Sequence, residues 1–140
     1  MTRFRTRRLA LLAATVAAAG CAAAGSRQPG EPVRAETGVA SYYAHAFDGQ
    51  RTASGAVYDE RGLTAAHRTL PFGSRVRVTN LANHRSVVVT ITDRGPHRHS
   101  RVIDVSHRAA EELGFVRAGT ARVRLEVLSL EAAKVSPDDR

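Results

Sequence analysis

The stretch Val87-Val88-Val89-Thr90-Ile91-Thr92-Asp93-Arg94-Gly95-Pro96 decides the fold of this chain. Its first half is a run of β-branched, apolar residues, which is typical of a strand. The strand ends in a carboxylate, an arginine and a Gly-Pro break. Asp93 is therefore expected at the rigid edge of a scaffold, where a catalytic carboxylate can be held in place. The structural alternative is that Asp93 caps the turn and pairs with Arg94.

A second acid follows a second short apolar run. Val102 and Ile103 lead to Asp104 only a few residues after the Gly-Pro break. We therefore predict that Asp93 and Asp104 face one cleft. The alternative for Asp104 is a structural carboxylate that accepts hydrogen bonds from backbone amides at the next turn.

The rest of the pattern is mostly that of strands. Alternation of apolar and polar residues predicts strands over residues 75–79 and 121–128, a further strand is expected over 39–43, and residues 63–67 form a short strand or a turn. Residues 44–61 contain scattered glycines and polar residues, which indicates a loop that lines a functional site. Because strands in a chain of this size close their edges best in a small barrel, we predict a mainly β barrel.

One short helix is expected late in the chain. Ser106 is a suitable N-cap for a helix over residues 107–113, and Gly114 is suited to stop it. The inward stripe of this helix would be Ala109, Ala110 and Leu113.

The first twenty residues predict an export signal rather than part of the fold. Four arginines precede an apolar run over residues 9–19, which is too short to span a bilayer comfortably. Small residues then lead to Gly20-Cys21, the pattern of bacterial lipoprotein signals. We therefore expect cleavage before Cys21 and lipidation of this cysteine. The alternative is an ordinary secretory signal with an incidental cysteine.

This reading divides the chain into four parts. They are a signal peptide over residues 1–20, a flexible tether over 21–36, a barrel domain over 37–129 and a disordered tail over 130–140. Ala22 follows the cysteine, at a position where an acid favours retention in the inner membrane. We therefore favour an exported protein anchored on the periplasmic side of the outer membrane, with the cell membrane as the alternative.

Composition narrows the function further. The single cysteine excludes an intramolecular disulfide and a cysteine-based metal cage. The formal net charge is +8, but four of the 21 basic residues and none of the 13 acidic residues lie in the signal segment. The remaining excess suits work near an anionic polymer or membrane and is too small to indicate nucleic-acid binding. His97 and His99 lie beside Asp93, but this spacing is a weak zinc signal, and we predict no metal and no cofactor.

Several short motifs, taken in chain order, resemble those of the rare lipoprotein A (RlpA) family of bacterial lipoproteins. They are Gly38-Val39-Ala40-Ser41-Tyr42-Tyr43, Thr52-Ala53-Ser54-Gly55, Leu63-Thr64-Ala65-Ala66-His67, Leu70-Pro71-Phe72-Gly73, Val76-Arg77-Val78-Thr79-Asn80, Asp93-Arg94-Gly95-Pro96 and Arg101-Val102-Ile103-Asp104. The resemblance implies a six-stranded double-psi β-barrel with one or two short helices. Expansins and the membrane-bound lytic transglycosylase A family share this barrel.

The same resemblance implies an endolytic lytic transglycosylase. Such an enzyme cleaves the β-1,4 bond between MurNAc and GlcNAc in peptidoglycan glycan strands, prefers strands without stem peptides, and leaves 1,6-anhydro-MurNAc ends. By position, Asp93 matches the family's catalytic aspartate and His67 matches a histidine needed for activity. Substrate binding is expected from Tyr42, Tyr43, Thr52, Asn80, Arg94 and Asp104. Many family members carry a C-terminal peptidoglycan-binding repeat domain, which we do not expect here because the chain ends about a dozen residues after its last predicted strand.

One position departs from the family. The family usually continues the Ala-Ser-Gly motif with a catalytic glutamate, where this chain has Ala56. A transglycosylase needs fewer carboxylates than a hydrolase, because the 6-hydroxyl of MurNAc attacks its own anomeric carbon and one carboxyl can transfer the proton both ways. Asp48, Asp59 and Glu60 lie in the same loop and are candidates to replace the glutamate. The alternative function is a non-cleaving, expansin-like peptidoglycan-binding lipoprotein.

Overall fold

The computed structural model describes residues 31–130. The predicted signal peptide, Cys21, most of the predicted tether and residues 131–140 lie outside the described residues. The elements are β1 (Arg34–Tyr42), the 3-10 helix η1 (His45–Phe47), β2 (Thr64–Ala66), β3 (Arg75–Asn80), β4 (Ser86–Asp93), β5 (Ile103–Val105), α1 (His107–Leu113) and β6 (Ala121–Ser129). Within this part of the chain, no helix has the length and apolar character of a membrane span.

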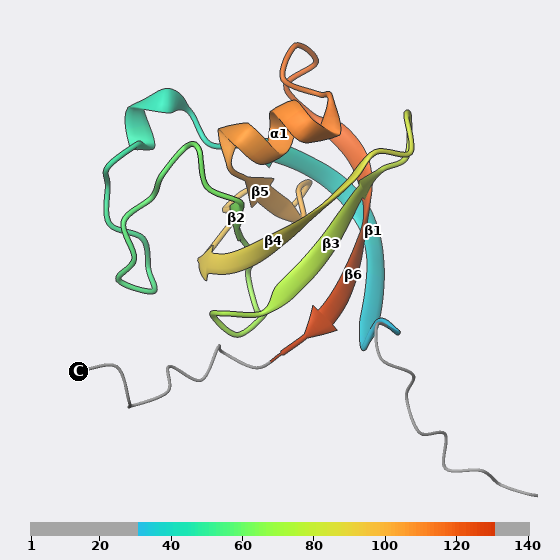
Figure 1. Ribbon diagram of the computed structural model, residues 1–140, viewed down its shortest axis with the longest axis horizontal. Coiled ribbons are helices and arrows are strands. Elements are labelled where there is room, and N and C mark those ends of the chain that lie inside the picture. Colours follow the sequence, from blue (N-terminus) through green and yellow to red (C-terminus); the bar gives the residue numbers. More distant parts are fainter. Residues whose placement is uncertain (1–30, 131–140) are drawn as a thin grey trace, which may run out of the picture.

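The six strands close into one barrel in the order β1-β5-β2-β4-β3-β6 (Figure 1). The long strands β1, β3, β4 and β6 pair antiparallel along the chain of neighbours β1-β6-β3-β4. The two short strands complete the wall, and two of the pairs, β1 with β5 and β2 with β4, are parallel. The mainly β barrel predicted from the sequence is confirmed.

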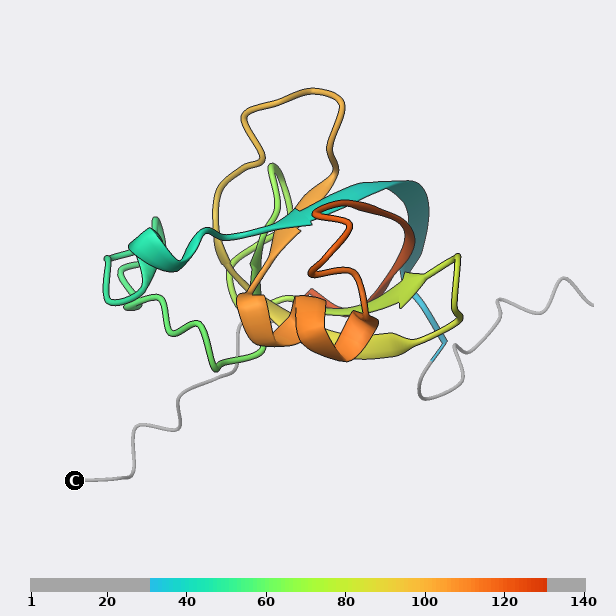
Figure 2. The ribbon, with the colours of Figure 1, turned by 90° about the horizontal axis from the view of Figure 1, so that it is seen from above.

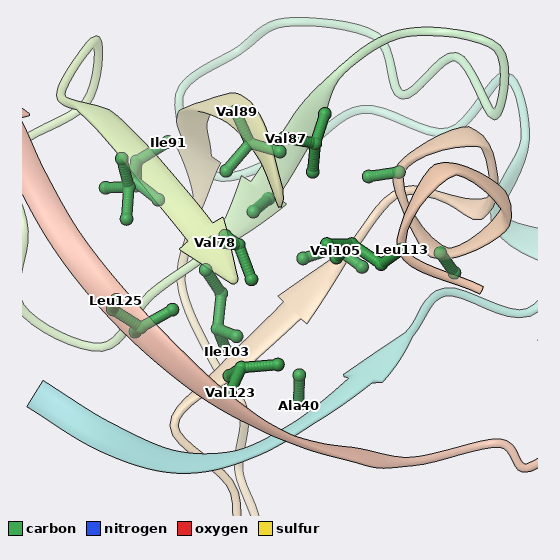
Figure 3. Packing of buried hydrophobic residues seen from close by; sticks show 14 of the residues in the cluster. Ala40, Val78, Val87, Val89, Ile91, Ile103, Val105, Leu113, Val123 and Leu125 are labelled. Atoms are coloured by element: carbon green, nitrogen blue, oxygen red, sulfur yellow. The ribbon is translucent and has the colours of Figure 1, made fainter. Parts of the chain in front are cut away.

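Alternation along the strands directs every second side chain into the barrel. In β4, Val87, Val89 and Ile91 are buried, while the residues between them are partly exposed. β6 contributes Val123 and Leu125 in the same way, and Figure 3 shows these side chains packed together inside the barrel. Each fully buried aliphatic side chain contributes about 1.5–3 kcal/mol to folding. The core therefore holds the strand ends that carry the polar residues described below.

Helix α1 covers one opening of the barrel. Its residues Ala109, Ala110 and Leu113 are buried in the core cluster. The side chain of Ser106 accepts a hydrogen bond from the amide of Ala109 at 3.2 Å, and Gly114 ends the helix in the left-handed conformation with φ of 76°. The predicted helix and both of its caps are therefore confirmed.

The start of the barrel differs from the prediction. The sequence pattern places Arg34, Ala35 and Glu36 in the flexible tether. In the structure they belong to β1 and pair with Val127, Glu126 and Leu125 of β6. The side chains of these three residues do not fill the core, so the sequence shows no alternation of apolar and polar residues here. Their strand conformation comes from the backbone hydrogen bonds that β6 supplies, which a local pattern cannot reveal.

Candidate active site

Four residues on four neighbouring strands form the floor of a cleft. Ser41 of β1 is paired with Asp104 of β5, Asp104 with Ala66 of β2, and Ala66 with Asp93 of β4. Since neighbouring strands are about 4.8 Å apart, the backbones of the two aspartates lie roughly 10 Å apart. All four residues line the same cleft, which has a volume of about 530 Å³. The barrel thus brings Asp93 and Asp104 to one site, with Ala66 on the strand between them.

The carboxylate of Asp93 is held by three hydrogen bonds. The amides of Ala53 and Arg94 donate to its Oδ1 at 2.9 and 2.8 Å, and the hydroxyl of Tyr43 donates to its Oδ2 at 2.6 Å. The two amides occupy the acceptor capacity of Oδ1, whereas Oδ2 keeps a lone pair that no amide uses. The carboxylate therefore caps the turn and also presents Oδ2 at the cleft.

Arg94 does not form the ion pair with Asp93 that the structural alternative for Asp93 requires. Its guanidinium donates to the carbonyl oxygens of Leu70 at 2.8 Å and of His67 at 3.3 Å. It also lies 3.9 Å from the centroid of the Phe72 ring, in the geometry of a cation–π contact. Arg94 lines the cleft, and its Nη1 group holds the neighbouring turn.

Tyr43 is a protonated hydrogen-bond donor to Asp93. Burial, followed by the hydrogen bond to Asp93, raises the pKa of the Tyr43 hydroxyl well above its ordinary value, with the charge of Asp104 acting in the same direction. Its ring is fixed by Phe47 and by Tyr58, whose ring centroid lies 4.6 Å away. Tyr43 therefore orients the Asp93 carboxylate from a rigid position.

Asp104 has side-chain partners rather than backbone amides. Its Oδ1 accepts a hydrogen bond from the hydroxyl of Ser41 and lies 3.8 Å from Nε of Arg101. Asp104 is the second carboxylate in the lining of the cleft.

Two segments form the walls of the cleft, and both project from the barrel in Figure 2. The segment between β1 and β2 contributes Ala44, Phe47, Gln50, Arg51, Thr52 and Tyr58, and the loop after β4 contributes Gly95, His97, Arg98 and Arg101. The first wall is attached to the floor, because Ala53 donates to Asp93 and the amide of Ser54 donates to the carbonyl of Thr92 at 3.2 Å. The predicted lining by this loop region is present in the structure.

Two of the residues expected in the site lie elsewhere. His67 is 5% exposed; its Nε2 lies 2.8 Å from Oε1 of Glu36, and its Nδ1 accepts hydrogen bonds from the amides of Thr69 and Leu70 at 3.2 and 3.1 Å. Because Nδ1 accepts, the proton is on Nε2, and the ring is neutral. His67 is not part of the cleft lining.

Asn80 lies at the opposite end of the β3–β4 hairpin from Asp93. Its side-chain amide donates to the carbonyl of Leu113 at 2.9 Å, and its Oδ1 accepts from the amide of Ala82 at 3.0 Å. These contacts stabilise the turn and the end of α1. The structure thus brings together Asp93, Asp104, Tyr42, Tyr43, Thr52 and Arg94 and leaves His67 and Asn80 outside the cleft.

The loop that carries Ala56 supplies no carboxylate to the cleft. Ala56 is exposed, and its carbonyl accepts from the amide and the hydroxyl of Thr52 at 2.8 and 2.7 Å. Asp48 accepts from the amide of Glu60, Asp59 accepts from the amide of Arg61, and Glu60 contacts His45 at 2.6 Å. None of these three acids lines the cleft, so Asp104 is the acid beside Asp93.

Among residues 31–130, no group of three or more His, Cys, Asp or Glu side chains is arranged to hold a metal ion.

The sequence reading missed several residues of the lining. Ser41 and Ala66 lie inside motifs already noted, and their strand register with the two aspartates is what places them on the floor. Phe47 is 47% exposed in the structure. In the sequence it is an aromatic residue within a polar, glycine-containing loop, and this position could have indicated a role in ligand binding. For the loop after β4, the sequence pattern indicates only a weak zinc signal, from the two histidines His97 and His99, and it gives no role to Arg98 or Arg101.

Comparison with known proteins identifies relatives of the whole barrel. A family model described as lytic transglycolase matches residues 35–125. The protein named endolytic peptidoglycan transglycosylase RlpA from Haemophilus influenzae is 54% identical over 91 residues, which are 65% of this chain and 32% of the relative. The protein of the same name from Pseudomonas aeruginosa is 56% identical over 89 residues, 64% of this chain and 26% of the relative. The chain thus spans about a third or less of these relatives.

Solved structures with the same barrel are more distant in sequence. The Streptomyces papain inhibitor is 22% identical with a TM-score of 0.58, and the match covers 70% of this chain and 97% of that one. The apo expansin of Clavibacter michiganensis is 19% identical with a TM-score of 0.54, covering 69% of this chain and 51% of the expansin. A mutant of this expansin has also been solved in complex with cellohexaose. These likenesses confirm the predicted double-psi β-barrel fold. With residues 35–125 matching the family model and relatives about half identical to it, this chain belongs to the lytic transglycolase family, as a relative of the RlpA proteins.

Proposed function

We propose that this protein is an endolytic peptidoglycan transglycosylase that acts through Asp93. The observation that carries the proposal is the row of Asp93, Ala66 and Asp104 across the floor of a cleft of about 530 Å³. A cleft of this size accommodates a short stretch of glycan. The activity in the names of the RlpA relatives supports the same reaction.

In the proposed reaction, Asp93 transfers one proton in each direction. The protonated carboxyl donates its proton to the oxygen that links C1 of MurNAc to C4 of GlcNAc, and the C1–O bond breaks. The C6 hydroxyl of the same MurNAc then attacks C1, and the Asp93 carboxylate accepts the hydroxyl proton. The products are a free GlcNAc 4-hydroxyl and a 1,6-anhydro-MurNAc end. No water is consumed, and Asp93 returns to its protonated form.

The contacts of Asp93 suggest which oxygen reacts. Oδ1 is occupied by two backbone amides, so Oδ2 is the oxygen that exchanges the proton. Tyr43 fixes the direction of Oδ2. The carboxylate of Asp104 is placed to stabilise the positive charge that develops at the anomeric carbon, because it lies two strands away on the same floor.

We propose that His67 acts as a positioning residue. Its Nδ1 organises the turn over residues 67–70, and the carbonyls of His67 and Leu70 in this turn hold Arg94, the neighbour of Asp93. The amide of His67 also donates to the carbonyl of Asp93 at 3.2 Å. The imidazole thus supports the backbone that carries the reacting carboxyl.

The second candidate function is a glycan-binding lipoprotein that does not cleave. It is favoured by Ala56, since the wall over residues 44–58 brings aromatic and polar side chains but no carboxylate to the cleft. The expansin with the same fold, solved with cellohexaose, supports a glycan as the ligand of such a barrel.

Incubation of the full chain with amidase-treated glycan strands separates the two candidates. We expect mass spectrometry to detect 1,6-anhydro-MurNAc ends, and Asp93→Asn to abolish them. This variant is a matched control, because an asparagine retains the acceptor oxygen for the two amides and cannot exchange the proton. Binding of the strands without any anhydro product would favour the second candidate.

We also propose that Cys21 carries a lipid that anchors the protein to the outer membrane, facing the cell wall. The signal-like segment before this cysteine supports the proposal. Metabolic labelling with palmitate in a bacterial host should label the chain, and Cys21→Ala should remove the label and release the protein from the membrane fraction. A label that persists in Cys21→Ala would contradict lipidation at this residue.

A further inference from the structure

The wall of the cleft formed by residues 95–101 is basic. It contributes His97, Arg98 and Arg101 to the lining, whereas the acids in the lining are Asp93 and Asp104 on the floor. This loop projects from the barrel (gold in Figure 2). A ligand that enters the cleft therefore meets the guanidinium groups of Arg98 and Arg101, with the imidazole of His97 beside them, on one side.

The side chains of His97, Arg98 and Arg101 make few contacts that hold the fold. Within residues 31–130, the exposed side chains of His97 and Arg98 form no hydrogen bond or ion pair. Arg101 has one distant ion pair in this part of the chain, to Asp104 at 3.8 Å, and its buried Nε has no hydrogen-bond partner. By contrast, Arg94 donates to two carbonyls, and Arg51 donates to the carbonyl of Gly55 at 3.0 Å. Of the arginines that line the cleft, only Arg98 and Arg101, both on the loop after β4, have side chains that make no hydrogen bond with the described part of the protein.

Arg68 holds this loop in place. Its Nε donates to the carbonyl of Pro96 at 3.2 Å, and one of its terminal nitrogens contacts the carbonyls of Arg98, His99 and Arg101. A single guanidinium therefore fixes the backbone of the loop along most of its length. Because the wall is ordered before a ligand arrives, binding costs less conformational entropy.

We propose that Arg98 and Arg101, with His97 beside them, bind the lactyl carboxylate of MurNAc and so select strands by charge. The inference rests on the proposed function, which brings a peptidoglycan strand into the cleft. In a strand that carries stem peptides, the lactyl carboxyl is part of an amide bond and has no charge. In a peptide-free strand, every second sugar presents a carboxylate, and guanidinium groups form charge-assisted hydrogen bonds with carboxylates.

The test compares two forms of one glycan. Peptide-free strands are used either with free lactyl carboxylates or after conversion of these carboxylates to methylamides, which keeps the sugar backbone and removes the charge. Initial rates of anhydro-product formation are measured with the full chain, and binding of both strands is measured with Asp93→Asn. We expect the methylamide strands to bind about tenfold more weakly and to have a KM about tenfold higher. We also expect the binding difference to shrink as salt is raised.

Variants assign the effect to the loop. Arg98→Gln and Arg101→Gln should each weaken binding of the charged strands and bring their affinity towards that of the methylamide strands. Arg117→Gln removes the same charge from an exposed position outside the cleft and should leave the difference unchanged. Arg98 is exposed, so Arg98→Gln should not affect folding. This variant alone can therefore test the inference if Arg101→Gln proves unstable.

The outcomes separate this inference from the proposed function. Equal binding of the two strands, or no binding of either, would overturn the inference even if cleavage occurs. Preferential binding of the charged strands without any cleavage would support it while contradicting the transglycosylase reaction.

Discussion

Oε1 of Glu36 lies 2.8 Å from Nε2 of His67 and joins the first part of β1 to the residue that follows β2. Glu36 also lies 3.5 Å from Arg34, which keeps its carboxylate beside the barrel. The contact satisfies a buried imidazole N–H, while the other ring nitrogen organises the turn that holds Arg94. A residue far from the cleft in sequence thereby supports the backbone around Asp93.

Glu36→Ala should lower both stability and activity. It leaves the N–H of His67 buried without a partner, which costs about 1–3 kcal/mol of the free energy of unfolding. Glu36→Gln keeps an acceptor oxygen and should recover most of the loss. Urea unfolding measures stability, and kcat should fall more than KM rises, since Glu36 does not line the cleft. A Glu36→Gln variant as impaired as Glu36→Ala would show that the charge, not the hydrogen bond, matters.

Tyr43→Phe should slow cleavage without unfolding the protein. The variant keeps the ring packing against Phe47 and Tyr58 but removes the hydrogen bond to Oδ2 of Asp93. A hydrogen bond to a charged group is worth about 1.5–3 kcal/mol, so kcat should fall roughly 10- to 100-fold. Steady-state rates of anhydro-product formation measure the effect. An unchanged kcat would show that Tyr43 does not orient the reacting oxygen.

The raised pKa of Tyr43 predicts a loss of stability at alkaline pH. The unfolded chain releases this proton near the ordinary value of 10.0, whereas the folded protein retains it to higher pH. The stabilising contribution is therefore complete below pH 10 and decreases as the pH rises above that value. Unfolding curves at several alkaline pH values should show a steeper decline for the native chain than for Tyr43→Phe. If stability declined equally with pH in the two proteins, a raised pKa of Tyr43 would be contradicted.

Ala56→Glu should raise the rate of cleavage. Residue 56 is exposed, and its carbonyl is fixed by Thr52 in the wall of the cleft, so a longer side chain fits without repacking the core. A carboxylate that stabilises the oxocarbenium-like state from this wall is worth up to ~10²–10³ in rate. Ala56→Gln, which has the same size without the charge, is the matched control. A rate increase that Ala56→Gln reproduces would exclude an electrostatic effect.

Gly38→Ala should destabilise the barrel where β1 passes the segment leading to β5. A Cβ at this position would overlap Cγ1 of Val102, closer than side chains pack. Such overpacking costs about 1–3 kcal/mol. Thermal and urea unfolding measure the loss, and the double variant Gly38→Ala/Val102→Ala should regain most of it. A double variant no more stable than Gly38→Ala alone would locate the strain elsewhere.

Local chemistry in the sequence determined the elements of this protein. The alternation in residues 75–79 and 121–128, the β-branched run over residues 87–91 and the Ser106 and Gly114 caps around α1 depend on neighbouring residues, so they could be predicted from the chain alone. The Gly-Pro break after Asp93 likewise marked the end of β4. The family motifs identified the double-psi barrel and the two aspartates of the cleft, with Tyr42, Tyr43, Thr52 and Arg94 beside them.

The tertiary structure decided which of these residues meet. The register that sets Asp93 and Asp104 on either side of Ala66 comes from pairing between strands distant in sequence, and no local pattern encodes it. The same holds for Arg34–Glu36, whose strand depends on β6, and for His67, which turns toward Glu36 rather than toward the cleft. The periodicity of the sequence determines which face of a strand is apolar. Which strands and side chains become its neighbours is determined by the closure of the barrel and by the pairing of buried polar groups.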